Sequence, residues 1–503
     1  MTTIDLSALQ NGSDIRGFAL DTEKQKKNLT EDTIKKIAHG LIHWWLEKTD
    51  KALADTTITI GHDSRLTGPD IKNWLTETFT RLGVNVIDAK MATTPALFMS
   101  TRYQEFESDI GIMITASHLP MEYNGLKFFT HAGGLEHEDI ASILALAEEE
   151  VEASDAIETK PKEQDLLAVY AADLVDKIRI ALNVDDTTKP LQNRKIIVDA
   201  GNGAGGFFAD KVLNILGADT SGSQFLDPDG TFPNHEPNPD NKEAMKSISN
   251  AVLENKADLG IIFDTDVDRS AIVDGEGNSI NRNNLIGLIG AIVLDENPGT
   301  TIVTNSPVSD HLIQFVEEIG GKVDRYISGY RNVINRGISL NEEGIDCALA
   351  IETSGHAALR ENYFLDDGAY LAAKIIAKEA KLAEENKSVT DLIKHLEQPA
   401  ETEEVRFVIT TDDYKDIGMD TLERFADWVK GTDGFTLVPD NLEGKRVQIT
   451  DPYGKGWLLL RMSLHEPKLV LQIENDTAGT IPTIKDKLKT FFHYESYIDN
   501  SKL

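Results

Sequence analysis

A serine and a histidine stand side by side in the segment 115–120, which reads TASHLP. A serine hydroxyl is a poor nucleophile unless a base, a metal or a preformed phosphoester changes its chemistry, so Ser117 would need help from other groups. The apolar run 109–114 predicts a strand, which places Ser117 in the loop at the strand's C-terminal end. Its hydroxyl could cap a following helix, and such a helix N-terminus could also hold a phosphoserine. The two roles are compatible.

A second loop carries three carboxylates within five residues. Asp264, Asp266 and Asp268 alternate with uncharged residues in the segment DTDVDR, which follows an apolar run. Carboxylates this close repel one another unless a cation offsets their charge, and oxygen ligands suit magnesium. An EF-hand is excluded, because its sixth position would be Arg269 instead of glycine and its twelfth Gly275 instead of glutamate. Magnesium binding is the prediction, with a solvated acidic turn as the alternative.

Two further loops collect polar groups. ETSGH (352–356) follows an apolar strand candidate, and RMSLHEP (461–467) lies between two more and brings together a cation, a hydroxyl and an imidazole, which are phosphate-binding groups. Arg16 and Lys127 could each be an ordinary surface charge. HDSR (62–65) ends another predicted strand, and a turn stabilised by its own side chains explains it equally well. The case for a shared site depends on all these segments occurring together.

Composition limits the partners of the protein. The 503 residues contain 84 Asp and Glu against 50 Lys and Arg, a formal net charge of -34. Such a field disfavours nucleic acid and anionic membranes, so a phosphorylated ligand would have to be held by local cations, a metal or helix N-termini. The only cysteine, Cys347, excludes an intramolecular disulfide and predicts a buried thiol. With no long apolar segment near the N-terminus, a soluble, cytoplasmic protein is expected.

Strand and helix patterns alternate along most of the chain, and its length suggests three to four domains. The first predicted α/β region has strands 56–64, 84–87, 109–114 and 126–130 and a helix 69–82. The second has strands 195–199 and 258–263, a helix after 200–206 and a helix 242–255. The third has a helix from about 281 to 294, strands 300–304 and 347–351 and a helix 310–319. From about residue 402 the pattern changes to a smaller α+β region with strands 457–462 and 469–473 and a helix 484–492. Ligands bind at the C-terminal ends of strands in such sheets, which is where the polar loops occur.

At this point the segments resemble a known family, the α-D-phosphohexomutases. TASHLP resembles the family's phosphoserine loop TASHNP, DTDVDR resembles its metal loop DGDGDR or DPDADR, ETSGH resembles its sugar loop ExSGH, and RMSLHEP is similar to its phosphate loop RPSGTEP. The resemblance covers nearly the whole chain. It implies three successive mixed α/β domains plus a smaller C-terminal α+β domain, heart-shaped around a central cleft. The domain bounds expected are 1–158, 159–280, 281–398 and 399–503.

The resemblance also implies roles for individual residues. The catalytic candidates are Ser117, Lys127, His356, Arg16 and His118. The magnesium ligands would be Asp264, Asp266 and Asp268 with an oxygen of phosphorylated Ser117. The substrate-binding candidates are Glu352, Ser354, Arg461, Ser463, His465, Arg269 and Arg65. The sequence departs from the family pattern at Leu119, Ile351, Leu464 and His465.

The activity implied is an intramolecular phosphoryl transfer that interconverts hexose 1-phosphate and hexose 6-phosphate, with glucose, mannose or both as the sugar. Phospho-Ser117 would donate its group and recover it through a bound hexose 1,6-bisphosphate, which would also prime the unphosphorylated enzyme. A phosphosugar phosphatase and a noncatalytic sugar-phosphate-binding paralogue are the alternatives. Phosphoglucosamine mutase is a further alternative, less favoured because those enzymes carry glutamine where this chain has Thr353. A monomer or homodimer is expected.

Overall fold

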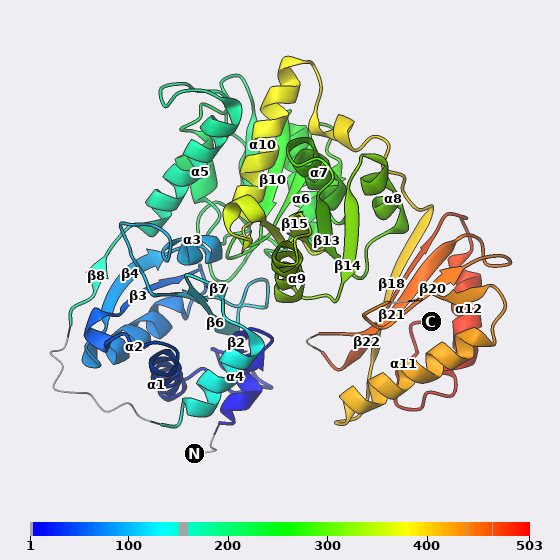
Figure 1. Ribbon diagram of the computed structural model, residues 1–503, viewed down its shortest axis with the longest axis horizontal. Helices are drawn as coiled ribbons and strands as arrows, with labels where there is room; N and C mark the ends of the chain where they lie inside the picture. Colours follow the sequence, from blue (N-terminus) through cyan, green and yellow to red (C-terminus); the bar gives the residue numbers. More distant parts are fainter. Residues whose placement is uncertain (1–3, 150–158, 440, 465) are drawn as a thin grey trace. The chain divides into compact units, whose positions relative to one another are not determined.

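The computed structural model describes residues 4–149, 159–439, 441–464 and 466–503 (Figure 1). The chain divides into two compact units, one formed by 1–292 with 354–392 and the other by 293–353 with 393–503. The division into four domains made from the sequence stays a prediction, and its first boundary, at 158, lies outside the described residues.

The first unit begins with a mixed sheet in the order β1-β2-β6-β5-β3-β4-β8, with β7 paired to β6. β3 pairs in parallel with β4 and β5, whereas β6 runs antiparallel to β5. Every residue of β5 is buried, as expected for a strand covered on both faces. The strands are β1 (Gln10–Asn11), β2 (Asp14–Phe18), β3 (Thr57–His62), β4 (Asn85–Met91), β5 (Ile110–Ile114), β6 (Tyr123–Thr130), β7 (Gly133–Gly134) and β8 (Lys162–Glu163).

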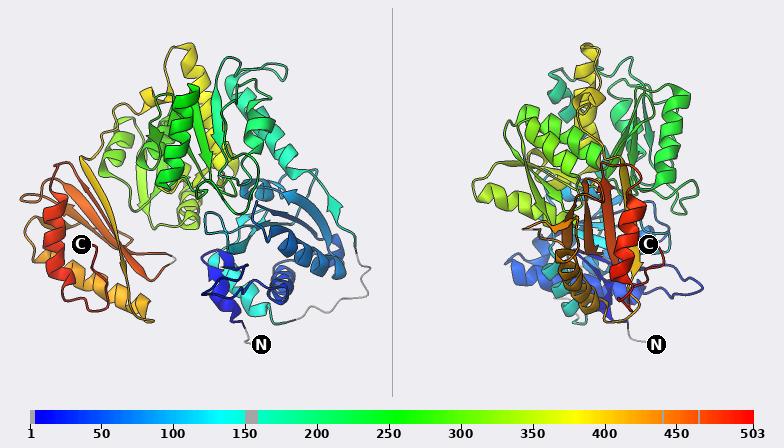
Figure 2. Two further views of the ribbon diagram at one scale, coloured as in Figure 1. Left: turned by 180° about the vertical axis from the view of Figure 1, so that it is seen from behind. Right: turned by 90° about the vertical axis from the view of Figure 1, so that its right-hand side faces the viewer.

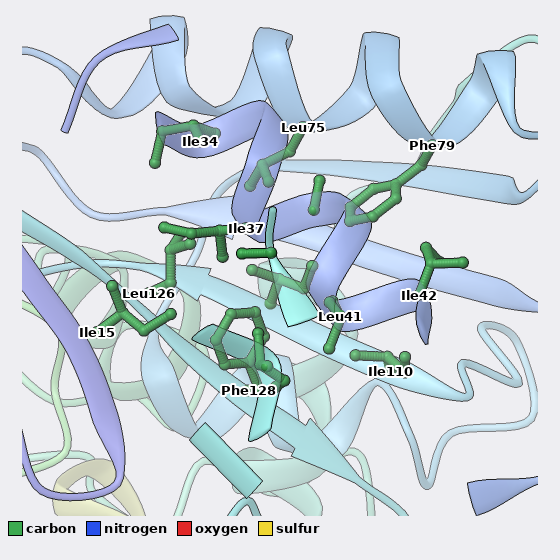
Figure 3. Packing of buried hydrophobic residues seen from close by; sticks show 14 of the residues in the cluster. Ile15, Ile34, Ile37, Leu41, Ile42, Leu75, Phe79, Ile110, Leu126 and Phe128 are labelled. Atoms are coloured by element: carbon green, nitrogen blue, oxygen red, sulfur yellow. The ribbon is translucent and has the colours of Figure 1, made fainter. Parts of the chain in front are cut away.

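Helices α1 (Glu31–Lys48), α2 (Gly68–Arg81), α3 (Thr94–Met99) and α4 (His137–Leu146) accompany this sheet. Thr30 caps α1 by accepting a hydrogen bond from Thr33 N, and α1 packs against α2 and α4. Side chains of α1, α2 and the sheet meet in one core, in which Ile37 and Leu41 of α1 lie near Phe128 of β6 (Figure 3). This core supports strands β5 and β6 on either side of residues 115–120, which we call the serine loop.

The first unit contains a second sheet in the order β12-β11-β10-β9, formed by β9 (Ile196–Asp199), β10 (Leu259–Phe263), β11 (Ser270–Asp274) and β12 (Ser279–Ile280). Helices α5 (Leu166–Leu182), α6 (Lys242–Asn255) and α10 (Gly368–Glu384) belong to the same unit, and α10 lies along α5 (Figures 1 and 2). β16 (Ala357–Leu359) and β17 (Leu365–Asp366) form an antiparallel pair. The helix expected after 200–206 is π-helical, at Phe208–Leu213.

The second unit combines a parallel sheet with an antiparallel one. β13 (Thr301–Asn305) lies between β14 (Lys322–Tyr326) and β15 (Cys347–Ile351), accompanied by α8 (Asp310–Glu318) and α9 (Tyr330–Glu342). Helix α7 (Asn283–Glu296) leads from one unit into the other. The C-terminal sheet has the order β18-β22-β21-β20-β19, and α11 and α12 add side chains to its single core. Its elements are β18 (Glu401–Val408), α11 (Tyr414–Lys430), β19 (Phe435–Leu437), β20 (Lys445–Ile449), β21 (Gly456–Met462), β22 (Lys468–Asn475) and α12 (Ile481–Phe492).

Two expectations concern single features. Cys347 is a free, buried thiol in β15, which confirms the prediction that it packs in a core. Among the described residues, no helix combines the length and apolar character needed to cross a bilayer.

A buried arginine ties the two sheets of the second unit together. Arg446, 1% exposed, donates to the carbonyl oxygens of Ser306 and Val308 at 3.1 Å each and to the Asp310 carboxylate at 2.8 Å. Its guanidinium lies over the Trp457 ring, 3.6 Å from the centroid. Burial lowers the pKa of Arg446 to about 10, against the opposing effect of Asp310. Breaking such a buried network would cost on the order of 3 kcal/mol of stability.

The pH dependence of stability can be predicted at one buried carboxyl group. Asp367 caps α10 and accepts hydrogen bonds from the Tyr170 hydroxyl at 2.5 Å and from Tyr370 N at 2.8 Å. Burial raises the pKa of Asp367 to about 6. The folded state therefore holds a proton that the unfolded state has released, so this group's contribution is fully present below the unfolded pKa and is lost as pH rises through 6.

Between pH 5.0 and 7.5 we expect Asp367 to lose about 1 kcal/mol of its contribution to the free energy of unfolding. The difference in melting temperature between wild type and Asp367→Asn should therefore shrink as the pH rises over that range. Asp185→Asn is the control, because Asp185 is exposed and hydrogen bonds from Thr187 and Thr188 lower its pKa, out of the range tested. A wild-type-minus-variant difference that is constant with pH would contradict the prediction.

Candidate active site

The serine loop leaves the C-terminal end of β5 with a strained backbone. Ser117 has φ +51°, in the left-handed region that residues other than glycine rarely adopt, and it is only 2% exposed. Its N–H donates to Thr115 Oγ1 at 2.8 Å, and Thr115 Oγ1 in turn donates to Asp63 Oδ2 at 2.7 Å. The sequence placed Ser117 in a loop at a strand end, and the structure does so too.

The Ser117 hydroxyl faces residues 264–269, which we call the aspartate loop. Its Oγ donates to Asp264 Oδ2 at 3.1 Å and accepts from Arg269 Nη2 at 3.2 Å. The same Arg269 nitrogen lies 2.7 Å from His118 Nδ1, which must therefore act as an acceptor. Burial, with Arg269 nearby, lowers the pKa of His118 well below its ordinary value. His118 is thus held neutral beside the Ser117 hydroxyl.

Arg65 is placed differently from the expectation that it binds substrate. Its guanidinium is buried under the serine loop and donates to main-chain carbonyl oxygens, including that of Ser117 at 2.5 Å. The segment 62–65 forms the expected turn, because Asp63 Oδ1 accepts from Arg65 N at 2.9 Å. With its donors directed at the backbone, Arg65 supports the loop instead of facing a ligand.

The aspartate loop joins β10 to β11 and holds its three carboxylates inside the protein. Asp264, Asp266 and Asp268 are at most 1% exposed, and one oxygen of each lies within 4.8 Å of the others. Between them Val267 has φ +68°, an outlier for a β-branched residue. Gly368, at the start of α10, lies so close that an added Cβ would stand 2.5 Å from the Arg269 carbonyl carbon. The packing of α10 therefore helps to fix the loop's shape.

Some carboxylate oxygens of the three aspartates accept hydrogen bonds from neighbouring side chains, and others do not. Asp266 Oδ2 accepts from Thr94 Oγ1 at 2.5 Å and Lys127 Nζ at 3.2 Å, and Asp268 Oδ2 accepts from Lys127 Nζ at 2.5 Å. The Oδ1 atoms of Asp266 and Asp268 are buried and, in the part of the chain that the structure describes, accept no hydrogen bond. Leaving buried carboxylate oxygens unsatisfied is costly. These oxygens and Asp264 fit a hard divalent cation such as Mg²⁺.

The pKa values of Asp264 and Asp268 are shifted in opposite directions. Burial raises the pKa of Asp264 well above its ordinary value, and the neighbouring Asp268 adds to the effect. Burial acts on Asp268 in the same direction, but the charges of Lys127, His356 and Arg269 together outweigh it and lower the pKa of Asp268. Burial opposes the charge of Arg269, yet Asp264 and Asp268 raise its pKa above the ordinary value. A charged Lys127 and Arg269 therefore flank the carboxylates. They supply the local cations that so acidic a protein needs in order to hold a phosphorylated ligand.

His356 approaches the same cluster from the segment after β15. Its Nδ1 lies 2.5 Å from Asp366 Oδ2, and a backbone bridge joins His356 to Arg269. Burial disfavours the charged ring, but Asp366 and then Asp268 raise the pKa of His356 to about 9. Arg16, in β2, donates to Asp14 at 2.9 Å and lies close enough for its charge to act on His118. Lys127, His356, His118 and Arg16 thus share the first unit with Ser117.

The remaining candidates lie at or beyond the end of β15 and in the C-terminal region. Glu352 Oε1 accepts from Gly329 N at 2.7 Å, and Ser354 follows two residues later. Arg461 is the last residue but one of β21, and Ser463 N donates to Lys468 O at 2.8 Å across the hairpin. His465 lies outside the described residues. Substrate binding by these residues stays a prediction.

Sequence reasoning did not single out several groups that the structure brings to these sites. Thr94 reaches Asp266 from 172 residues away, and Asp366 orients His356. Glu443 lies 3.6 Å from Arg461 Nη1, accepts from Ser328 N at 3.1 Å and also contacts the hydroxyl of Ser306. None of these lies in a recognisable motif, so only the fold could identify them.

Comparison with known proteins shows the family of this chain. Domain models of the phosphoglucomutase/phosphomannomutase family match three consecutive stretches, alpha/beta/alpha domain I at residues 8–154, domain II at 169–277 and domain III at 281–399. The chain belongs to the phosphoglucomutase/phosphomannomutase family. The predicted membership of the α-D-phosphohexomutases is thereby confirmed, as is a fold of three α/β/α domains followed by a β-rich C-terminal domain.

Relatives of known name extend along nearly the whole chain. The phosphoglucomutase of Neisseria meningitidis serogroup A is 30% identical over 477 residues, 95% of each chain. The phosphomannomutase/phosphoglucomutase of Pseudomonas putida is 30% identical over 466 residues, 91% of this chain and 92% of the relative. A phosphoglucomutase/phosphomannomutase family protein from Burkholderia thailandensis has a similar solved structure, with a TM-score of 0.77 and 24% identity over 98% of both chains.

Proposed function

We propose that this family member is an isomerase that interconverts hexose 1-phosphate and hexose 6-phosphate through a phosphoserine at Ser117, with glucose and mannose as the sugars. The observation that carries the proposal is the placement of Ser117 Oγ, 3.1 Å from Asp264 and 3.2 Å from Arg269, beside two buried carboxylate oxygens without hydrogen-bond partners among the described residues. Phosphoryl transfer needs this combination of a nucleophile, a cation and positioned charge.

The cycle consists of two transfers. Phospho-Ser117 donates its phosphoryl group to the free hydroxyl of a hexose monophosphate, which leaves the Ser117 hydroxyl and a bound hexose 1,6-bisphosphate. After the intermediate has turned round, the Ser117 oxygen attacks its other phosphate and the isomeric monophosphate leaves. Added bisphosphate would prime any enzyme that lacks phosphate. The phosphate is conserved and no water is consumed.

Residues of the first unit supply the remaining chemistry. Mg²⁺ would be held by Asp264, Asp266 and Asp268 with an oxygen of phospho-Ser117, and it would neutralise charge on the transferring group. Arg269 donates toward the Ser117 oxygen and stabilises the charge that develops there. Our candidates for moving the proton of the sugar hydroxyl are His356 and Lys127, because histidine and lysine can exchange protons, whereas Arg16 would orient or stabilise charge. Since the pKa of His356 is raised to about 9, His356 would have to release its own proton before it could accept the one from the sugar.

Substrate recognition is assigned to the other loops. Glu352 and Ser354 would bind sugar hydroxyls, and Arg461, Ser463 and His465 would bind the phosphate that does not react. Hydroxyls other than the one at C2 do not distinguish glucose from mannose, so we expect activity on both. We retain the expectation of a cytoplasmic monomer or homodimer.

The decisive experiment assays purified protein with Mg²⁺ and a hexose 1,6-bisphosphate primer on the 1-phosphates of glucose, mannose, glucosamine and N-acetylglucosamine. We expect conversion of the first two to the 6-phosphates, with phosphate found at Ser117 by peptide mass spectrometry. Release of inorganic phosphate without isomerisation would indicate a phosphatase, and tight binding without turnover a noncatalytic paralogue. Either result would reject the proposal.

Glu443 provides a prediction about substrate binding. Its carboxylate lies 3.6 Å from Arg461 and accepts from Ser328 N at 3.1 Å and Ser328 Oγ at 2.6 Å, so it neutralises the cation that we assign to the substrate phosphate. Glu443→Gln keeps the shape and removes the charge. We expect KM for glucose 1-phosphate to fall several-fold with little change in kcat, because an anion near a phosphate site opposes binding.

Glu423→Gln is the matched control, since Glu423 is exposed and pairs with Lys445 in the same region. It should leave KM unchanged. A rise in KM for Glu443→Gln would contradict the prediction, because it would mean that the Glu443 carboxylate itself holds the substrate.

A further inference from the structure

The backbone of the serine loop is gripped by one buried side chain. Arg65 Nη2 donates to the carbonyl oxygens of Ser117 at 2.5 Å and Leu119 at 2.6 Å. Arg65 Nη1 donates to those of Pro120 at 2.8 Å and Tyr123 at 2.9 Å. Four N–H groups of a planar guanidinium thus fix four carbonyls along seven residues. Lysine, with three donors on one nitrogen, cannot reproduce this pattern.

A second chain of hydrogen bonds, through Thr115, holds the N–H of Ser117. Asp63 pairs with Arg65, whose Nε lies 3.4 Å from Asp63 Oδ2, and the same oxygen accepts from Thr115 Oγ1 at 2.7 Å. Thr115 Oγ1 accepts from Ser117 N at 2.8 Å. The N–H and the C=O of Ser117 are therefore both connected to the Asp63–Arg65 pair.

These ties act on a strained residue. A left-handed backbone costs a residue with a Cβ about 1 kcal/mol or more, so Ser117 keeps φ +51° only while its surroundings hold it there. Rotation of its backbone toward the extended region would swing Oγ away from Asp264 and Arg269. A displacement of about 1 Å at a reacting group can reduce a rate by roughly 100-fold.

Arg65 is closed off from any ligand. Its side chain is fully buried, and the Phe232 ring lies beside it with its centroid 5.3 Å from Arg65 Cζ. The backbone of the Gly230 segment approaches so closely that an added Cβ would stand 2.5 Å from the Ser64 carbonyl oxygen. Arg65 can influence the reaction only through the loop that it holds.

We infer that Arg65 and Asp63 are positioning residues, which hold Ser117 in its left-handed backbone conformation and so aim its Oγ at Asp264 and Arg269. This inference rests on the proposed function of Ser117 as the phosphoryl carrier. It separates the two kinds of arginine near the site: Arg269 touches the nucleophile, whereas Arg65 acts through the main chain.

The test compares kcat and KM for glucose 1-phosphate in Arg65→Lys, Thr115→Val and Thr115→Ser. Lysine at 65 should lower kcat about 10- to 100-fold and leave KM within about twofold, because substrate contacts stay intact. Thr115→Val removes the oxygen that bonds Ser117 N and should act in the same direction. Thr115→Ser keeps that oxygen and should retain most of the activity.

Arg446→Lys is the matched control. It also replaces a buried arginine that donates to loop carbonyls, so it should lower the melting temperature comparably while leaving kcat near that of wild type. If Arg65→Lys and Thr115→Val keep kcat within twofold of wild type, or if Thr115→Ser loses as much as Thr115→Val, the inference is wrong. If Arg65→Lys does not fold, the two Thr115 variants decide. A wild-type enzyme without mutase activity would reject the proposed function instead.

Discussion

Ser117→Ala should lower mutase turnover by about 10⁴-fold or more, because the variant has no oxygen to carry the phosphoryl group. Binding of glucose 1-phosphate should be little changed, since no residue assigned to the sugar or to the unreactive phosphate is altered. The measurements are kcat with a hexose 1,6-bisphosphate primer and the mass of the peptide that contains residue 117. That peptide should gain one phosphate in wild type and none in the variant.

Ser100→Ala is a matched control for this experiment. Ser100 is also a fully buried serine of the first unit, but its Oγ donates to Leu97 O at 2.7 Å and plays no part in the site. Its variant should keep normal turnover and a phosphorylated peptide around Ser117. Substantial turnover in Ser117→Ala, or phosphate at another residue, would refute the phosphoserine mechanism.

The sequence predicts well the elements whose signals are local. The predicted bounds of the strand 347–351 and the helix 242–255 are those observed. An apolar run marks the limits of the strand, and a capping residue marks the start of the helix. Helix α1 is not among the predicted elements, although Thr30 can cap it and Ile34 and Ile37 have helical spacing. The π-helix Phe208–Leu213 differs from an α-helix only in its hydrogen bonds, which the order of residues does not reveal.

The residues of the candidate site also fall into two groups, those that a short motif reveals and those that only the fold brings to the site. Ser117 and the three aspartates occur in short motifs, so their loops could be recognised and the fold brings them into contact. For Arg65 the resemblance implies substrate binding, because hydrogen bonds to main-chain carbonyls leave no mark in the sequence. Thr94 and Asp366 come from distant segments, and only the packing of α3 and β17 places them beside the cluster.

Removing the metal should have the second large effect. We expect chelation with EDTA to abolish mutase activity and added Mg²⁺ to restore it, because the buried carboxylates then lack the cation that offsets their repulsion. In wild type, Mg²⁺ should also raise the melting temperature, since a ligand that binds only the folded state stabilises it. This second readout does not depend on turnover.

Asp268→Asn should reduce both responses. The change removes a charge from a side chain whose Oδ1 has no hydrogen-bond partner in the described residues and whose Oδ2 lies 2.5 Å from Lys127. We expect turnover to fall by roughly 100-fold or more, the Mg²⁺ concentration for half activity to rise, and the Mg²⁺-induced thermal shift to shrink.

Asp274→Asn serves as the control, because Asp274 ends the neighbouring strand β11 and accepts hydrogen bonds from Glu276 N and Asn278 N within its own turn. That variant loses stability through the turn, yet its thermal shift with Mg²⁺ should equal that of wild type. An equal shift in Asp268→Asn would mean that the cation binds elsewhere. The buried oxygens of Asp266 and Asp268 would then need another partner, since a fold does not retain unsatisfied buried carboxylates without compensation.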